Sequence, residues 1–302
     1  MYDVSIITVN YNSSNDTLNM IESVKSKTTL NYEIIVVDNN SSLEEYKKLE
    51  VIKNIDNIKL IRSRLNLGFA GGNMLGFKEA KSDYIFFLNN DTLLINGVID
   101  ILYKDCKDDD SIGLISPQLF DENANKTTTF RYFPSVAEKF FGKGFANFIA
   151  TKKRYNNKKE YENIIDVEVV SGASMFFQRE CFENIGGFDT DFFLYCEEED
   201  LSKRVSDSGL KVCFEPNAHL IHLCGKSTGR NFKVEREFII SYFRLVDKHF
   251  GFIKKNLLKL HIFLKYLFKA NKNETNKKLF DFILEKDKQK YSLRNEQKMS
   301  DE

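Results

Sequence analysis

The chain of 302 residues is 42% hydrophobic and 29% charged, a composition typical of a globular protein with a substantial core. Lysine and arginine together number 44, as do aspartate and glutamate, so the formal net charge is zero. This balance argues against a protein that binds nucleic acid through a broadly basic surface, and we expect no nucleic-acid partner.

The cysteines and the hydrophobic runs indicate a cytoplasmic protein. The five cysteines show no spacing typical of metal or redox sites, so we expect reduced thiols. The sequence enters a strand pattern directly after its first residues, without a signal peptide, and no apolar run reaches the length of a membrane span.

The first 116 residues alternate strand and helix patterns. Short apolar runs predict strands at residues 4–9, 33–37, 58–61, 84–88 and 112–115. Amphipathic patterns between them predict helices at residues 15–27, 43–53, 70–80 and 98–106. Alternation of this kind predicts an α/β fold with a doubly wound, mostly parallel sheet.

The alternation stops after residue 117. Residues 118–165 contain a polar loop, an aromatic-rich patch and a helix expected from Ser135. Further strands are expected at residues 167–170, 174–177 and 211–214, a helix at 198–206, and helices from about residue 234 to the end.

Polar side chains follow three of the expected strands. They are Asn-Tyr-Asn at residues 10–12, Asp-Asn-Asn at 38–40 and Asn-Asn-Asp at 89–91. The carboxyl ends of parallel strands lie at one edge of a sheet, where open α/β folds bind ligands. Each cluster alone is also good turn or helix N-cap chemistry, so the combination predicts the site.

The chemistry of these strand ends favours a phosphate-bearing ligand. The oxygens of Asn89 and Asp91 suit a hard divalent cation, and Asp38 can accept hydrogen bonds from a base or ribose. Gly68, Gly71 and Gly72 surround the start of a helix, where the backbone can approach a phosphate, although close helix packing explains them equally well. Neither a dinucleotide fingerprint nor a P-loop is present.

Four acidic residues run from Glu197 to Asp200. Acidic residues are also favoured at an exposed helix N-terminus, which is the simpler interpretation. Leu201 and Val205 follow at helical spacing, however, and bury one face of the helix. One or two of the carboxylates can therefore point into a cleft and take a proton from a hydroxyl nucleophile.

A single histidine, His222, lies in a later apolar run. A lone histidine of this kind is usually a core residue. The glycine, lysine, serine and threonine at residues 225–228 indicate a phosphate-facing loop instead.

In this order the segments resemble family 2 glycosyltransferases of the GT-A fold, particularly the rhamnosyltransferase-like members. Each motif is weak alone, but the ordered set is specific and covers about residues 3–230. The matching pieces are residues 5–12, 36–42, 66–73, 88–92, 171–173, 186–189, 195–201, and 222 with 225–227. The resemblance implies a GT-A catalytic domain over residues 1–230, with nucleotide-sugar binding in 1–116 and the acceptor side in 117–230, followed by a helical extension over 231–302.

The resemblance implies an inverting glycosyltransferase of the hexosyltransferase class. The donor would be dTDP-rhamnose or a UDP-sugar, and the acceptor a glycan or lipid-linked glycan in surface polysaccharide biosynthesis. Asp91 and His222 would bind Mg²⁺ or Mn²⁺ that bridges the diphosphate. The residues that would contact the nucleotide sugar are Thr8, Asn10, Asn12, Asp38, Asn66, Gly68, Gly72, Asn73, Asn89, Asn90 and Lys226.

The acidic run matches the family's Glu-Asp-x-Asp pattern, whose second position is the general base. Glu198 has that position, with Glu197 and Asp200 beside it as catalytic candidates and Glu199 as a competing base. Glu198 stands where aspartate is usual, and its extra methylene moves the carboxylate by about one bond length, which matters for proton transfer. Asn89 replaces the first aspartate of the family's Asp-x-Asp.

These departures leave open a non-catalytic sugar-nucleotide or glycan-binding module as the alternative function. A nucleotidyltransferase would require a glycine-rich, basic triphosphate loop near the N-terminus, which the sequence lacks. Residues 252–260 and 262–269 mix apolar residues with lysine, as in helices that lie on anionic membranes. Packing on the catalytic domain or homodimer formation explains them equally well. Membrane contact would place the protein at the inner face of the cell membrane.

Overall fold

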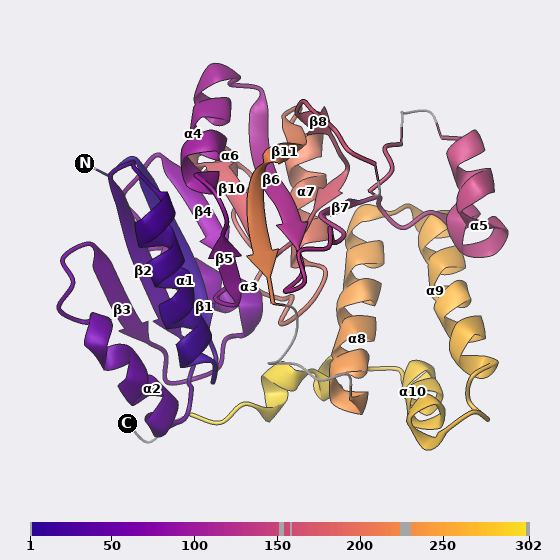
Figure 1. The fold of residues 1–302 in the computed structure, drawn as a ribbon. Helices are drawn as coiled ribbons and strands as arrows, with labels where there is room; N and C mark the ends of the chain where they lie inside the picture. Colours follow the sequence, from indigo (N-terminus) through magenta and orange to yellow (C-terminus); the bar gives the residue numbers. More distant parts are fainter. Residues whose placement is uncertain (1, 151–153, 158, 224–230, 300–302) are drawn as a thin grey trace.

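The computed structural model describes residues 2–150, 154–157, 159–223 and 231–299. A curved central β-sheet carries helices on both faces, and a group of C-terminal helices lies to one side of it (Figure 1).

The nucleotide-side half of the sheet is parallel, as predicted. Its strands, in the spatial order β3-β2-β1-β4, are β3 (Ile58–Arg62), β2 (Tyr32–Asp38), β1 (Val4–Asn10) and β4 (Tyr84–Leu88). The connecting helices are α1 (Ser14–Lys27), α2 (Leu43–Leu49) with the short 3₁₀ turn η1 (Glu50–Ile52), and α3 (Gly68–Phe77). The carboxyl ends of β1, β2 and β4 therefore meet at one edge.

The other half of the sheet is mixed. The strand β10 (Ser174–Gln178) lies between β4 and β6 (Ile112–Phe120) and is antiparallel to both. The long strand β11 (Lys211–His222) is parallel to β6, and β5 (Thr92–Leu94) pairs antiparallel with its last residues. The sheet departs here from simple parallel winding because the chain leaves β6, makes a long excursion and re-enters the sheet in the opposite direction.

Side-chain alternation along β4 produces two cores. Phe86 packs on one face of the sheet with α1 and α4 (Val98–Asp108), whereas Phe87 packs on the other face with α6 (Arg179–Asn184) and α7 (Glu197–Asp207). Both phenylalanines are fully buried. Burial of each stabilises the fold by roughly 1.5–3 kcal/mol.

The excursion between β6 and β10 carries a small second sheet and one helix. In this sheet β7 (Phe130–Arg131) pairs with β9 (Val169–Val170), while β8 (Ile165–Asp166) pairs with β11. The helix α5 (Val136–Phe148) begins after Ser135, whose side chain caps it as the sequence indicates.

The C-terminal extension is built from α8 (Phe232–His249), α9 (Phe252–Leu267) and α10 (Glu274–Leu284). They share a core that also includes Phe192 and Cys196, so the extension packs directly against the segment that precedes the acidic run. Two 3₁₀ turns follow, η2 (Gln289–Tyr291) and η3 (Leu293–Glu296). The prediction of helix to the end is wrong for these residues, since the chain leaves α10 and returns to the edge of the sheet near α2 (Figure 1).

Within the described residues, no helix has both the length and the hydrophobicity needed to cross a membrane. Four of the cysteines are free and buried, namely Cys106, Cys181, Cys196 and Cys213. Cys224 lies outside the described residues.

Candidate functional site

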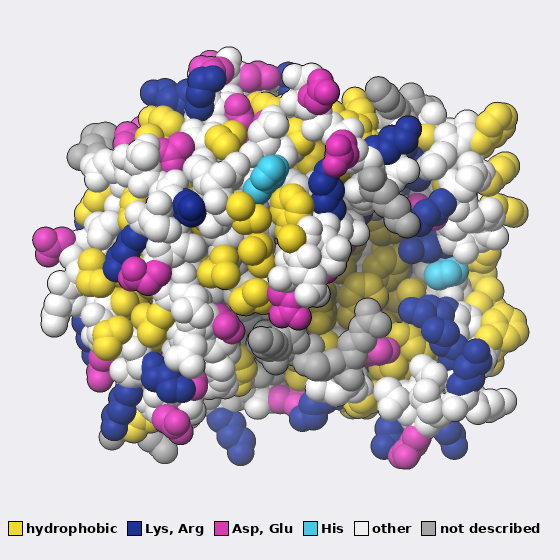
Figure 2. Space-filling model, in the orientation of Figure 1, with side chains coloured by type: hydrophobic (Ala, Val, Ile, Leu, Met, Phe, Trp, Pro, Cys, Tyr) yellow, Lys and Arg dark blue, Asp and Glu magenta, His cyan; other side chains and the backbone are white. Residues whose placement is uncertain are grey.

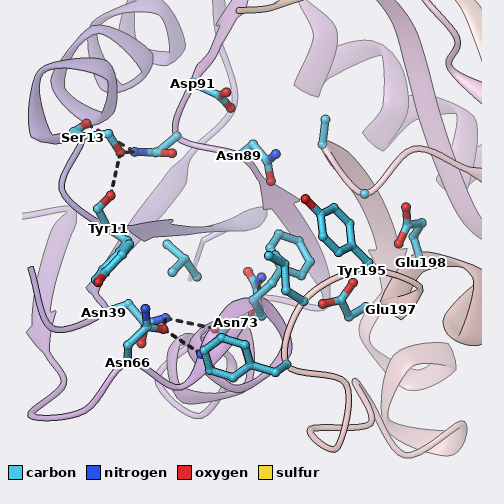
Figure 3. Close-up of a pocket in the computed structure, with 18 of the residues that line it drawn as sticks. Tyr11, Ser13, Asn39, Asn66, Asn73, Asn89, Asp91, Tyr195, Glu197 and Glu198 are labelled. Carbon is cyan, nitrogen blue, oxygen red and sulfur yellow. Dashed lines mark hydrogen bonds between the residues drawn. The ribbon is translucent and has the colours of Figure 1, made fainter. Parts of the chain in front are cut away.

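A pocket of about 570 Å³ opens at the carboxyl edge of β1 and β4. This volume is typical of sites for small molecules and cofactors. In Figure 3 the carboxylates of Glu197 and Glu198 lie across the pocket from Tyr11 and Asn39. The pocket brings together nine of the predicted site residues, which are Asn66, Gly68, Asn73, Asn89, Asn90, Asp91, Glu197, Glu198 and His222.

Asp91 and His222 are neighbours because β5 pairs with the end of β11. In this antiparallel pair His222 lies opposite Thr92, and the Leu223 amide donates to the Asp91 carbonyl at 2.9 Å. This pairing places His222 Nε2 3.2 Å from Asp91 Oδ1, and both side chains are largely buried in the pocket wall.

A carboxylate oxygen and an imidazole nitrogen form a donor set that fits Mn²⁺, and the carboxylate also suits Mg²⁺. Among the described residues no group of three or more histidine, cysteine, aspartate or glutamate side chains could hold a metal. A metal held by this pair would therefore need further ligands from a bound substrate or from water, which suits an ion that grips a diphosphate.

Several predicted nucleotide contacts lie behind the pocket wall and do not line it. Asn10 is buried, and its Nδ2 donates to Asp38 Oδ1 at 2.9 Å. Asp38 also accepts from the Ser41 amide and lies 3.8 Å from Arg62 Nε. These bonds satisfy a buried carboxylate and tie the ends of β1 and β2 together.

Asn12, Thr8 and Asn90 have three different environments. Asn12 is exposed, has a positive φ of 53° and accepts from the Ser42 amide. Thr8 is fully buried within β1, and its hydroxyl has no hydrogen-bond partner in the described structure. Asn90 reaches the pocket, but its Nδ2 donates to Ser13 Oγ at 2.7 Å, so it also braces the wall.

The start of α3 is built around one glycine. Gly68 has a φ of +72°, and a Cβ there would lie 2.1 Å from the Phe193 carbonyl oxygen, to which the Phe69 amide donates at 2.9 Å. Asn39 fixes the same turn, since its Nδ2 donates to Asn66 Oδ1 and to the Gly68 carbonyl. Glycine is therefore required at residue 68 for the close approach of the segment that leads to the acidic run.

Two more of the predicted contacts are explained by α3 itself. Gly72 packs α3 onto β1, since a Cβ there would lie 3.0 Å from the methyl groups of Val9. Asn73 lines the pocket, and its Nδ2 donates to the Phe69 carbonyl at 3.0 Å. Lys226 lies outside the described residues.

The acidic run forms the first turn of α7, whose N-cap Cys196 is left-handed with a φ of 67°. Glu197 is buried, lines the pocket and has one carboxylate oxygen without a hydrogen-bond partner in the described structure. Burial, reinforced by the charge of Glu198, raises its pKa well above the ordinary value.

Arg131 holds the next two carboxylates. It pairs with Glu198 through Nη2 and with Glu199 at 2.7 Å. Burial and the charge of Glu198 raise the pKa of Glu199 to about 7, although Arg131 opposes the shift. Glu198 lines the pocket, whereas Glu199 does not.

Asp200 points away from the pocket. Its carboxylate is bound by Arg204, Lys248 and His249, with His249 Nε2 2.7 Å from Oδ1. Burial favours the protonated form, but the hydrogen bond with His249 and the cations dominate and lower the pKa of Asp200 to about 2. Asp200 thus links α7 to α8.

Sequence reasoning missed several residues of the site. Tyr11 and Tyr195 line the pocket, as do Leu293 and Gln297 from the far end of the chain. Arg131 belongs to the aromatic-rich patch within residues 118–165, but only the pairing of β7 with β9 brings it close to the acidic run.

Comparisons with known proteins identify the family of the chain. Residues 5–186 match the family model described as glycosyl transferase family 2. The N-acetylglucosaminyl-diphospho-decaprenol L-rhamnosyltransferase of Mycobacterium tuberculosis is 22% identical over 82% of this chain and 85% of its own length. The rhamnosyltransferase WbbL of Escherichia coli is 27% identical over 63% of this chain and 72% of its own.

Solved structures show the same GT-A fold. The mannosyltransferase PcManGT from Pyrobaculum calidifontis, in complex with GDP-Man and Mn²⁺, aligns with a TM-score of 0.57 and 16% identity over 92% of this chain and 76% of that chain. GalNAc-T7 with UDP, GalNAc and Mn²⁺ aligns with a TM-score of 0.59 and 15% identity over 82% of this chain, which spans only 48% of that chain.

Proposed function

The chain belongs to glycosyltransferase family 2, and from that membership we propose that it is an inverting, metal-dependent enzyme that moves a sugar from a nucleoside-diphosphate donor to a hydroxyl group of a glycan or lipid-linked glycan. One observation carries the proposal. A single pocket contains both the Asp91–His222 pair and the carboxylate of Glu198. In such an arrangement, one site can stabilise the leaving diphosphate and also take the proton of the attacking hydroxyl group.

The relatives support a donor of the dTDP-rhamnose or UDP-sugar type. Two of them are named rhamnosyltransferases, and one of these carries a diphospho-decaprenol acceptor in its name. By the same likeness we assign the chain to surface polysaccharide assembly. The base and ribose contacts of Asp38 and its neighbours remain part of this proposal, although in the structure their polar groups bind one another.

Asp91 and His222 would hold Mn²⁺ or Mg²⁺, and Asn89, with its neutral amide, would be a weaker participant. When bound, the metal would neutralise the charge that develops on the diphosphate as it leaves. The protein's own contribution is to fix the two side chains through the pairing of β5 with β11 and to keep both largely buried in the pocket wall.

We assign the general base to Glu198. The acceptor oxygen attacks the anomeric carbon, its proton passes to the Glu198 carboxylate, and the bond from carbon to phosphate oxygen breaks with its electron pair on the diphosphate. The ion pair with Arg131 orients the Glu198 carboxylate.

The neighbouring acids fit the role of base less well. Burial raises the pKa of Glu197 well above its ordinary value, which favours the protonated form and so disfavours Glu197 as a proton acceptor. Glu199 does not line the pocket and is bound by Arg131, and Asp200 is bound by cations on α7 and α8.

The acceptor proposal extends to a membrane surface. Exposed apolar side chains gather on α5 and α9, along the right-hand edge of the molecule in Figure 2. Phe148 is 86% exposed, Phe252 77% and Phe268, at the C-cap of α9, 75%. The helix α9 contains four lysines and no acidic residue, which favours contact with anionic lipid, although Lys255 and Lys259 pair with Asp247 of α8.

One face of α9 is nevertheless packed against the neighbouring helices of the extension. Leu258, Ile262 and Tyr266 are buried against α8 and α10. We propose that the opposite face contacts the membrane that carries a lipid-linked acceptor, at its inner surface. Formation of a homodimer through the same face is the competing outcome.

A non-catalytic sugar-nucleotide-binding module is the second candidate, favoured by the neutral Asn89 and by the ion pair that occupies Glu198. Incubation with UDP-, dTDP- and GDP-sugars in the presence of Mn²⁺ separates the two functions. An enzyme should release free nucleoside diphosphate slowly even without acceptor, whereas a binding module should retain the donor intact.

A further inference from the structure

The last described part of the chain returns to the pocket. After α10, residues 285–299 cross from the helical extension to the edge of the sheet, as Figure 1 shows for the final yellow segment. Leu293 and Gln297 of this segment line the same pocket as Asn39, Asp91 and Glu198. We call residues 292–298 the C-terminal strap.

A buried glutamate on α8 anchors the beginning of the strap. Glu237 Oε1 accepts from Ser292 Oγ at 2.8 Å, and Oε2 accepts from the Leu293 amide at 2.7 Å. Glu237 and Ser292 are both almost fully buried. A buried carboxylate is costly without hydrogen-bond partners, and the strap supplies partners for the Glu237 carboxylate of α8.

Further contacts hold the strap along its length. Glu296 pairs with Lys233 and with Arg236, each at 2.6 Å, and Arg294 donates to the Thr190 carbonyl. At the far end Asn40 Nδ2, just beyond β2, donates to the Lys298 carbonyl at 2.9 Å. The strap therefore bridges α8 and the nucleotide-side half of the sheet, and Gln297 lies beside the second anchor.

The amide of Gln297 is suited to a ligand. The pocket amide of Asn39 is used within the protein, in bonds to Asn66 and to the backbone of α3. Gln297 donates one amide hydrogen to the Leu293 carbonyl at 2.7 Å, a bond that fixes its direction within the strap. The second amide hydrogen and the oxygen can pair with a base edge or a ribose hydroxyl.

We infer that the C-terminal strap is a wall of the donor pocket and that Gln297 hydrogen-bonds the nucleoside of the donor. We favour the nucleoside over the sugar as the group that Gln297 contacts. Gln297 lies next to the contact between the strap and Asn40 at the end of β2, whereas the proposed general base belongs to α7. The inference rests on the proposed function. It assigns donor recognition to a residue far outside the region that matches the family model.

Binding of UDP, dTDP and GDP, each with Mn²⁺, tests the inference by calorimetry on the full chain. Gln297→Ala should lower the affinity for the nucleotide that the wild type binds best by about fivefold, which is the usual cost of one lost hydrogen bond. Gln289→Ala, an exposed glutamine on the approach to the strap, should leave the affinity unchanged. Pyrophosphate with Mn²⁺ has no nucleoside, so Gln297→Ala should bind it as the wild type does.

Wild-type affinity of Gln297→Ala for every nucleotide would overturn the inference while leaving the proposed function intact. An equal loss of pyrophosphate and nucleotide affinity would also overturn it, since the residue would then act on the phosphates or on the fold. A wild-type protein that binds none of the three nucleotides would instead overturn the proposed function along with it.

Discussion

His222 Nε2 lies 3.2 Å from Asp91 Oδ1, where the chain entering β5 pairs with the end of β11. The strand β5 has only three residues, yet its pairing with the end of β11 sets the relative position of the two side chains. The candidate metal site is therefore a property of strand register, because a shift of one residue would turn His222 to the other face of the sheet.

Replacement of Asp91 by alanine should weaken Mn²⁺-dependent binding of UDP by at least about 100-fold, since a metal contact to a diphosphate contributes several kcal/mol. His222→Ala should weaken this binding less, because it removes a neutral imidazole where Asp91→Ala removes a charged carboxylate. Calorimetric titration with and without Mn²⁺ measures both. Asp110→Ala, at an exposed aspartate after α4, is the matched control, and equal affinity of the Asp91 variant and this control would contradict the metal assignment.

Glu198→Gln should lower kcat by about 100- to 10,000-fold and leave donor binding nearly intact, because only the proton acceptor is removed. Glu197→Gln should retain far more activity, since burial raises the pKa of Glu197 and favours its protonated form. Initial rates at saturating donor compare the two variants. A larger loss for Glu197→Gln would transfer the role of base to that residue.

Stability should fall as the pH rises because the acidic run is buried. A carboxyl group whose pKa is higher in the folded state contributes its stability below its ordinary pKa and loses it as the pH rises toward the folded value. For Glu199 this loss of stability extends from pH 4.5 to about pH 7. For Glu197 it also begins at pH 4.5, the ordinary pKa of a glutamate.

Glu197→Gln is neutral at every pH, so its Tm should match that of the wild type near pH 5 and exceed it by a few degrees at pH 8. Thermal unfolding followed by circular dichroism at both pH values measures the difference. Glu180→Gln, at an exposed glutamate of α6, should show no such divergence. Identical pH profiles for Glu197→Gln and the wild type would show that Glu197 is not held protonated.

How far the sequence predicts this fold depends on the element. The strand at residues 84–88 was predicted with its observed bounds, because an apolar run ends abruptly in polar residues. The strand expected at 211–214 extends in fact to His222. Its middle, at residues 215–217, breaks the apolar pattern with Glu-Pro-Asn, where the structure has an irregularity in register with β6.

The candidate site was predicted in part for the same reason. Strand ends and the acidic run carry local signals, so Asp91 and the run at residues 197–200 could be selected from the sequence, whereas the choice of Glu198 within the run came from the family resemblance. Arg131 and Gln297 reach the pocket only through long-range packing, by the pairing of β7 with β9 and by the return of the chain from α10. Periodicity and turn chemistry contain no information on such contacts.

Gly68→Ala should destabilise the protein by roughly 1–3 kcal/mol, because its φ of +72° and the Phe193 carbonyl at 2.1 Å from an added Cβ both oppose a side chain. Urea unfolding measures the change. Gly144→Ala is the matched control, since its added Cβ meets nothing within 4 Å inside α5, and it should be neutral or stabilising. Equal stability of both variants would contradict the requirement for glycine at residue 68.

Phe141→Ser combined with Phe148→Ser should reduce binding to vesicles of anionic phosphatidylglycerol, measured by co-sedimentation, because two exposed aromatic anchors are removed from α5. Val51→Ser removes an equally exposed apolar side chain from η1, remote from this surface, and should have no effect. Unchanged vesicle binding together with a shift from dimer to monomer in sedimentation velocity would assign the surface to self-association instead.

The release of nucleoside diphosphate from a panel of UDP-, dTDP- and GDP-sugars tests the central claim most directly, with wild type and Asp91→Ala assayed in parallel. We expect the wild type to release nucleoside diphosphate from at least one donor in Mn²⁺, and we expect this release to be lost both in EDTA and in the Asp91 variant. Absence of release from every donor, or release that persists unchanged in Asp91→Ala, would contradict a metal-dependent glycosyltransferase centred on Asp91 and His222.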